Sequence, residues 1–105
     1  MMRYHSKRSK ATDIPQSVKI IVYARDEGLC IFCGKPGLPN AHYVARSQGG
    51  LGIEQNIITA CPVCHQRMDN STDRKRMKQV AAAYLRSQYP DWDEKKLVYR
   101  KWGFE

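Results

Sequence analysis

The sequence predicts a small α+β domain built around a bound metal ion, and three observations support this fold class. The chain has 105 residues, which is enough for one modest core but too few for two ordinary domains. It contains two Cys-x-x-Cys pairs with the spacing of metal-binding knuckles, at Cys30, Cys33, Cys61 and Cys64. Segments with helical spacing of apolar residues flank two short runs of strand-like composition.

Three parts follow one another along the chain. Residues 1–12 are basic, contain no acid and few apolar groups, and are predicted to form a flexible arm. Residues 13–70 contain both cysteine pairs and are predicted to form the folded core. Residues 71–105 carry the strongest helical pattern and are predicted to form a helical extension.

The core elements are predicted in the following order. The segment "DIPQSVKIIVYARDEG" indicates a helix, with Asp13 as its cap, Pro15 in its first turn and Gly28 after its end. The runs "NAHYVARS" and "NIITA" indicate two short strands, and the glycines of "QGGLGIEQ" mark the loop between them. The residues "CHQRMDN" should begin a short helix.

The extension should contain the longest helix, over "DRKRMKQVAAAYLRSQY", with Pro90 after its end. Its apolar stripe consists of Met77, Val80, Ala81, Tyr84 and Leu85. The basic residues that point away from this stripe are Arg74, Lys75, Lys78 and Arg86. A further helix is predicted in "DWDEKKLVYRKW", where we expect Trp92, Tyr99 and Trp102 to pack on the core.

The four cysteines predict a structural Zn²⁺ site. Each knuckle supplies two thiolates from a tight turn, for which Gly34 gives the backbone freedom, and two knuckles complete a tetrahedron. No secretory or membrane-spanning segment is evident, so we expect a cytoplasmic protein, where paired cysteines more often bind metal than form disulfides. The alternative is four unrelated thiols, which would deprive a small core of a main source of folding free energy.

Four further polar residues are not explained by such a zinc site. His42 lies on the first predicted strand, and Asn56 begins the second. His65 and Asp69 are one turn apart on the predicted short helix, so their side chains point the same way. The hairpin and this helix should therefore enclose a cleft with imidazoles from both elements.

The motifs "CIFCG", "AHYVARSQGG" and "EQNIITACPVCH" resemble those of the HNH endonucleases. The chain is similar in particular to small phage-type members that carry cysteine knuckles. The order of the motifs, the glycine loop and both knuckles agree over residues 13–70. The resemblance implies the ββα-metal fold, also called the His-Me finger, held together by zinc and flanked by helices.

The resemblance also implies a role for the three residues that carry the family's letters. His42 would be the general base that takes a proton from the attacking water. Asn56 would be structural, tying the loop to the hairpin and orienting His42. His65 would be a ligand of a single catalytic divalent ion, which would hold a phosphate oxygen and neutralise the leaving oxygen. The alternatives are a solvent-facing strand histidine, an ordinary turn asparagine and a surface histidine.

The position before the general base departs from the family pattern. Many members have an acidic residue or a second histidine there as a metal ligand, whereas this chain has Ala41. We therefore predict that His65 and Asp69 hold the catalytic ion, Mg²⁺ or Mn²⁺, with water and phosphate completing its shell. Asn40 is a further candidate donor. The alternative for Asp69 is a helix-end carboxylate beside Arg67.

The net charge of +8 favours a polyanionic partner, and nucleic acid is the usual partner of a small basic domain. A basic protein without such a partner is the alternative. Arg46, which we expect on the same strand as His42, and Arg67 are candidate phosphate clamps. Sequence-independent DNA contacts are predicted in the N-terminal arm and at Arg74, Lys75 and Lys78.

These features predict a metal-dependent DNA endonuclease that hydrolyses phosphodiester bonds, by nicking or by double-strand cleavage. The resemblance implies a preference for double-stranded DNA and a bacterial or phage-infected host cytoplasm. So short a chain has little room for a sequence-reading domain, so a homodimer or a targeting partner would have to supply specificity. The alternative is a zinc-stabilised DNA-binding module with weakened catalysis, of which Ala41 would be the trace. A protein-interaction zinc ribbon would not need His42.

Overall fold

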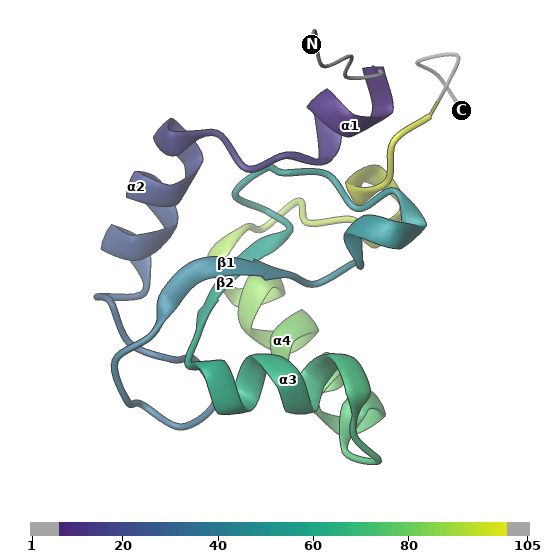
Figure 1. Ribbon diagram of the computed structural model, residues 1–105. Helices are drawn as coiled ribbons and strands as arrows, with labels where there is room; N and C mark the ends of the chain where they lie inside the picture. Colours follow the sequence, from purple (N-terminus) through teal and green to yellow (C-terminus); the bar gives the residue numbers. More distant parts are fainter. Residues whose placement is uncertain (1–6, 101–105) are drawn as a thin grey trace, which may run out of the picture.

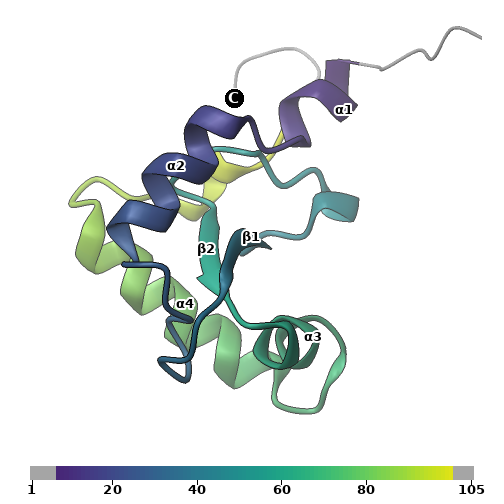
Figure 2. The ribbon, with the colours of Figure 1, turned by 60° about the vertical axis from the view of Figure 1, so that its left-hand side comes forward.

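The computed structural model describes residues 7–100, and the ribbon views show how its elements are arranged (Figures 1 and 2). The elements are α1 (Lys7–Thr12), α2 (Gln16–Arg25), β1 (Leu38–His42), the 3-10 turn η1 (Arg46–Gln48), β2 (Ile57–Ala60), α3 (Pro62–Asn70), α4 (Arg74–Gln88) and the 3-10 turn η2 (Glu94–Leu97). Helix α2 contacts both strands, and α4 packs against α3. The predicted α+β class is therefore confirmed.

The two strands form an antiparallel hairpin that presents different side chains to its two faces. Ala41 lies opposite Ile58, and His42 lies opposite Ile57. Because side chains alternate along a strand, Ala41 and His42 face opposite sides. Ala41 and Ile58 are fully buried in the core, to which the helices and η2 contribute Met68, Met77, Ala81, Leu85 and Leu97.

A buried ion pair joins the end of α2 to β2 and α4. Arg25 Nε lies 2.7 Å from Asp26 Oδ1, and the two side chains are 9% and 0% exposed. Asp26 also accepts hydrogen bonds from the Thr59 backbone N–H at 2.9 Å and from the Tyr84 hydroxyl. Burial by itself would raise the pKa of Asp26, but the hydrogen bonds from Arg25 and Tyr84 outweigh it, so this pKa lies below its ordinary value.

The glycine loop between the strands is held between the hairpin and the C-terminal segment. The Leu51 N–H donates to the Leu97 carbonyl oxygen at 2.8 Å. A Cβ atom on Gly50 would lie only 1.7 Å from the Val44 carbonyl oxygen, so no side chain fits there. The glycines predicted to mark a loop thus permit close backbone packing.

The N-terminal segment differs from the flexible arm predicted from its composition. Residues 7–12 form α1, whose Ala11 carbonyl oxygen accepts a hydrogen bond from the Gly52 N–H at 3.0 Å. The segment is ordered because the glycine loop allows its backbone to approach, a tertiary contact that composition does not report. Arg3 and the rest of residues 1–6 lie outside the described residues.

The C-terminal segment is also less helical than its sequence suggests. Between α4 and residue 100, the last residue described, only η2 forms, because the backbone around Leu97 pairs with the glycine loop. Trp92 packs on the core as predicted, edge-on to Tyr43 with ring centroids 5.6 Å apart, and its indole N–H donates to the Gln55 carbonyl oxygen at 2.8 Å. Trp102 lies outside the part of the chain that the structure describes.

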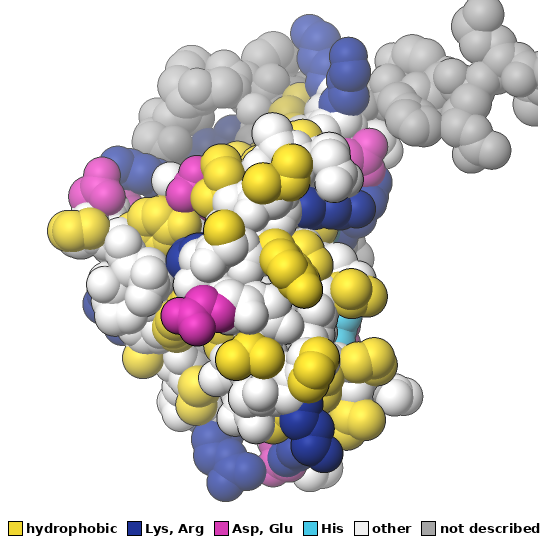
Figure 3. Space-filling model, turned by 90° about the vertical axis from the view of Figure 1, so that its left-hand side faces the viewer, with side chains coloured by type: hydrophobic (Ala, Val, Ile, Leu, Met, Phe, Trp, Pro, Cys, Tyr) yellow, Lys and Arg dark blue, Asp and Glu magenta, His cyan; other side chains and the backbone are white. Residues whose placement is uncertain are grey.

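The side of the molecule that carries α2 exposes many hydrophobic side chains (Figure 3). Ile20 and Tyr23 of α2 are 61% and 51% exposed, and Leu38 of β1 is 56% exposed, whereas Val22 is fully buried. Despite these exposed side chains, none of the helices within residues 7–100 is long and apolar enough to cross a membrane.

Candidate functional site

The four cysteines lie on two tight turns that meet beside the hairpin. The first turn is closed by a hydrogen bond of 2.9 Å from the Gly34 N–H to the Cys30 carbonyl oxygen. Gly34 has φ 79°, the left-handed conformation that glycine adopts without strain. Cys61 precedes the first turn of α3, and its Sγ accepts a hydrogen bond from the Cys64 N–H at 3.4 Å. This hydrogen bond lowers the pKa of the Cys61 thiol to about 7, which favours the thiolate.

The positions of the sulfur atoms fit a tetrahedral metal ion. The Sγ atoms of all four cysteines lie within 4.8 Å of one another, and those of Cys33 and Cys61 are 3.7 Å apart. Four sulfurs at about 2.3 Å from one Zn²⁺ would be separated by about 3.8 Å. The predicted grouping of the cysteines is thus confirmed, and the cluster could hold a metal ion such as zinc with little rearrangement.

A cleft of about 480 Å³ brings together three of the residues predicted to act in catalysis or metal binding. His42 reaches it from the end of β1, and His65 and Asp69 reach it from α3. The basic residues of its wall are Arg46, Arg74 and Lys78. The cleft therefore combines two imidazoles and a carboxylate with cationic groups suited to an anionic ligand.

The hydrogen bond of His42 decides which of its ring nitrogens can act as a base. Nε2 lies 2.9 Å from the Thr12 backbone oxygen. A carbonyl oxygen can only accept, so Nε2 carries the hydrogen, and in the neutral ring Nδ1 keeps its lone pair. Burial lowers the pKa of His42, the Thr12 hydrogen bond opposes this effect, and the charge of Arg46 lowers the pKa further. The neutral ring is therefore favoured near neutral pH.

The amide of Asn56 joins the glycine loop to the segment that follows His42. Asn56 is fully buried, and its Oδ1 accepts a hydrogen bond from the Val44 N–H at 2.8 Å. Its Nδ2 donates to the Leu51 carbonyl oxygen, also at 2.8 Å. The Val44 N–H is thus bonded to a side chain and not to the backbone of a neighbouring strand, so the ladder of backbone hydrogen bonds between β1 and β2 does not continue past this point. The expectation that Arg46 shares the strand of His42 is therefore wrong, because Arg46 lies in η1.

His65 and Asp69 lie as their helical spacing predicts. His65 Nε2 is 3.4 Å from Asp69 Oδ2, and the side chains are 32% and 42% exposed. Two donors in adjacent positions of an octahedral ion, each at about 2.1 Å, would be about 3 Å apart. The pair could therefore share a divalent ion after a small closure, with water or a substrate oxygen as the other ligands. Without an ion, a protonated His65 would form an ion pair with Asp69.

The two arginines predicted as phosphate clamps differ in position. Arg46 lines the cleft and pairs with Asp13, which does not line it. Asp13 is not the cap of α2 that was predicted, because Pro15 occupies the N-cap position. Arg67 pairs instead with Asp73, at 2.6 Å between Nη2 and Oδ2, and does not line the cleft. Of the two predicted phosphate clamps, only Arg46 therefore lies in the cleft.

The residues before His42 also differ in what they can contribute. Ala41 is fully buried in the core, does not line the cleft and has no side-chain atom that could bind a metal ion. Asn40 is exposed and lines a separate hollow of about 570 Å³ together with His42 and Arg46. Asn40 does not line the cleft that contains His65.

Two features of the site were not predicted from the sequence. The first is the Thr12 carbonyl oxygen, since no residue pattern marks a backbone acceptor. The second is the position of Lys78, which was expected on the solvent side of α4 but is half-buried. Its Nζ donates to the Tyr43 carbonyl oxygen and lies 5.1 Å from the centroid of the Tyr43 ring. The helical pattern correctly predicted that Met77, Ala81 and Leu85 are buried, but Val80, expected on the same stripe, is 46% exposed. The pattern also does not report the neighbour that covers Lys78.

The fold and the cleft define a class of protein, a small α+β domain in which a cysteine cluster adjoins a basic cleft with two imidazoles. Residues 30–71 match the family model of the HNH endonucleases, which confirms the resemblance over that segment. The match includes both cysteine pairs and His42, Asn56 and His65. It indicates a nuclease, with nucleic acid as the substrate class and a metal site. A comparison with curated proteins found no match.

Proposed function

We propose that this protein is a metal-dependent DNA endonuclease in which His42 is the general base. The hydrogen bond from His42 Nε2 to the Thr12 carbonyl oxygen is the main support, because it leaves Nδ1 as the unprotonated nitrogen of a half-buried ring. This ring lines the same cleft as His65 and Asp69.

The predicted site residues have different parts in the proposed hydrolysis. Nδ1 of His42 takes a proton from water as the water oxygen attacks phosphorus, and the Thr12 carbonyl oxygen stabilises the imidazolium that results. The bond between phosphorus and the leaving sugar oxygen breaks, and that oxygen takes a proton from solvent water. His65 and Asp69 would hold a divalent ion, Mg²⁺ or Mn²⁺, which would supply positive charge to the phosphate oxygens. Asn56 keeps the loop and the end of β1 in place, and the cysteine cluster, with zinc, would stabilise the fold.

Plasmid nicking tests the role of His42. With added Mn²⁺, His42→Ala should lower the cleavage rate by about 10²–10⁴-fold, the usual contribution of general-base catalysis. Metal content and DNA affinity should stay at the wild-type level. Ser47→Ala, which changes another residue of the cleft wall without a proposed role, should retain activity. Undiminished cleavage by His42→Ala would remove this residue from the mechanism.

The pH dependence gives an independent test of the same residue. Because the pKa of His42 is lowered and the neutral ring is the active form, the cleavage rate should rise with pH. It should level off above a midpoint that lies below the ordinary histidine value of about 6.5. A midpoint clearly above that value, at saturating metal, would contradict the assignment.

A DNA-binding module without catalysis is the second candidate. The observation in its favour is that, among the described residues and apart from the proposed base His42, the cleft is lined by only one histidine and one carboxylate, His65 and Asp69, that could hold a catalytic ion. Wild-type protein that binds DNA but cleaves none with either Mg²⁺ or Mn²⁺ would support this candidate.

A further inference from the structure

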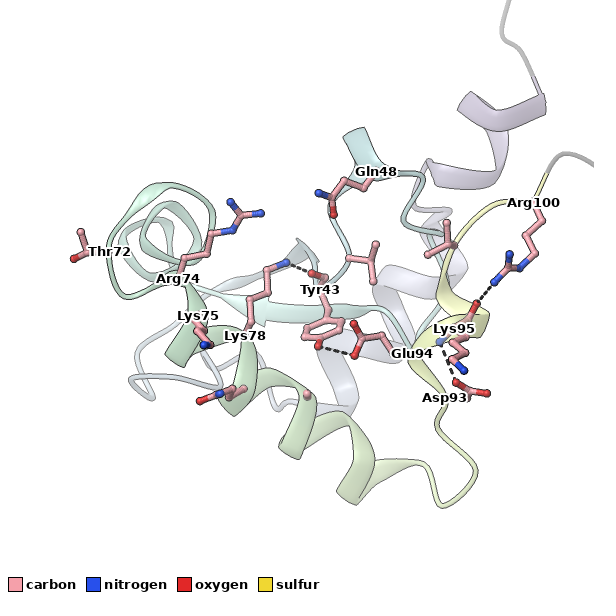
Figure 4. A pocket seen from close by; sticks show the side chains of 14 residues that line it. Tyr43, Gln48, Thr72, Arg74, Lys75, Lys78, Asp93, Glu94, Lys95 and Arg100 are labelled. Atoms are coloured by element: carbon pink, nitrogen blue, oxygen red, sulfur yellow. Dashed lines mark hydrogen bonds between the residues drawn. The ribbon is translucent and has the colours of Figure 1, made fainter. Parts of the chain in front are cut away.

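A second and larger hollow adjoins the cleft. This groove has a volume of about 1190 Å³ and lies between α4 and the segment around η2 (Figure 4). Arg74 and Lys78 line both the groove and the cleft. A bound chain could therefore pass from the cleft into the groove without leaving a basic surface.

One wall of the groove is basic and the opposite wall is partly acidic. The basic residues on the α4 side are Arg74, Lys75 and Lys78 (Figure 4). Within residues 7–100, none of them forms an ion pair with an acid, whereas Arg67 on the neighbouring surface is paired with Asp73. Asp93 and Glu94 line the other wall, where they would repel phosphate. Lys95 and Arg100 on the same side balance their charge, so that only the α4 wall is net positive (Figure 4). Phosphates in this groove would therefore follow the α4 wall.

The floor of the groove is apolar, which a binding site for phosphate alone would not require. The floor is defined as the apolar residues that line the groove, which are Val44, Ala82, Val98 and Tyr43; of these, Tyr43 and Ala82 are only 7% and 8% exposed. The Tyr43 hydroxyl is turned to the acidic wall, where it donates to Glu94 at 3.1 Å. An apolar surface next to a row of cations suits a single strand of nucleic acid whose bases face into the groove and whose phosphates remain at its rim.

We propose that this groove binds unpaired nucleotides of the DNA strand next to the bond that is cut. In a duplex the bases are stacked inside the helix and cannot reach a concave apolar floor, whereas unpaired bases can. The groove exceeds the roughly 300–1,000 Å³ of typical small-ligand pockets, so more than one base has room. The substrate class is DNA with a single-stranded stretch beside the cut, as in a gap, a flap or an overhang. The position of the cut, but not the binding of unpaired DNA, rests on the proposed nuclease function.

Binding experiments with a matched pair of variants test the proposal. Ala82→Gln places a neutral, helix-compatible side chain on the floor, and Ala83→Gln makes the same change at the next, exposed position outside the groove. Fluorescence anisotropy, without added divalent ion, would compare a single strand with a blunt duplex of the same sequence. Electrostatics alone favours the duplex, which has the higher charge density. We expect wild type to bind the single strand more tightly, and Ala82→Gln to weaken that binding about tenfold while Ala83→Gln does not.

A second pair covers the case in which Ala82→Gln fails to fold. Val98→Asn removes apolar surface from the floor, and Val80→Asn makes the same change at an exposed position outside the groove. Tighter binding of the duplex by wild type, or floor variants that bind like their controls, would overturn the proposal. If wild type cleaves DNA and the floor variants match their controls, the groove assignment fails and the nuclease stands. If wild type cleaves nothing but the floor variants lose single-strand binding, the nuclease fails and the groove stands.

Discussion

Replacing Asp26 with asparagine should destabilise the protein strongly, because it removes one charge of a buried pair. Arg25, only 9% exposed, would keep its positive charge without a neighbouring anion. The amide of asparagine has one acceptor oxygen in place of two, and its NH₂ group would face donors. It could not serve Arg25, the Thr59 N–H and the Tyr84 hydroxyl together.

The size of the effect follows from the burial of the pair. Removing one partner of a buried ion pair costs about 3–5 kcal/mol, a large part of the roughly 5–15 kcal/mol that holds a small protein folded. With a urea dependence of about 1–3 kcal/mol per molar, a loss of about 4 kcal/mol lowers the unfolding midpoint by roughly 1–4 M. Asp73→Asn is the matched control, because Asp73 pairs with arginines at the surface and its loss should change the midpoint little.

Urea unfolding of the metal-loaded proteins, followed by circular dichroism, measures the two midpoints. The lowered pKa of Asp26 also determines the pH range over which its ion pair stabilises the folded protein. Its contribution to the free energy of unfolding is fully present above the ordinary pKa of about 3.9 and is lost as the pH falls through the lower folded-state value. The difference between wild type and Asp26→Asn should therefore narrow only in acid. Equal shifts for Asp26→Asn and Asp73→Asn at neutral pH would refute the reasoning.

Three further results are expected. Cys61→Ser should lose the tightly bound metal and become unfolded or insoluble, and a folded wild-type sample without metal would contradict the thiolate site. Asp69→Ala should cut less at low Mn²⁺ and partly recover at high Mn²⁺, so superimposable titration curves would exclude Asp69 as a ligand. Replacing Arg74 and Lys75 with glutamine should flatten the slope of log affinity against log salt, by about 0.7–0.9 for each phosphate that the variant no longer neutralises. An unchanged slope would mean that Arg74 and Lys75 do not contact phosphate.

The features that could be predicted from the sequence are those fixed by local geometry. A Cys-x-x-Cys turn places two sulfurs together whatever the rest of the fold does, and a tetrahedral metal ion needs two such pairs, so two turns of this spacing predicted the cluster of four. The same holds for His65 and Asp69, which one helical turn brings to the same side. His42 could be assigned to this cleft because the order of the motifs resembles a known family.

The features that could not be predicted depend on contacts between distant segments. Arg25 and Asp26 are adjacent in the sequence and resemble the charged end of a surface helix, and only packing against β2 and α4 buries them. Lys78 lies on the face of α4 that its helical spacing predicts to be exposed, and it is half-buried only because the backbone at Tyr43 passes next to it. The order of residues 7–12 likewise depends on the neighbouring glycine loop and not on their composition.

The hydrogen bond between Thr12 and His42 bears on how this domain could be shortened or transplanted. The match to the HNH family model begins at residue 30, whereas the carbonyl oxygen that fixes the hydrogen on the imidazole belongs to Thr12, 30 positions before His42. A fragment trimmed to the family borders would keep every candidate metal ligand and yet leave that ring free to exchange tautomers. The family motif is thus smaller than the unit that would perform the chemistry. A graft into another scaffold would need its own acceptor at this place.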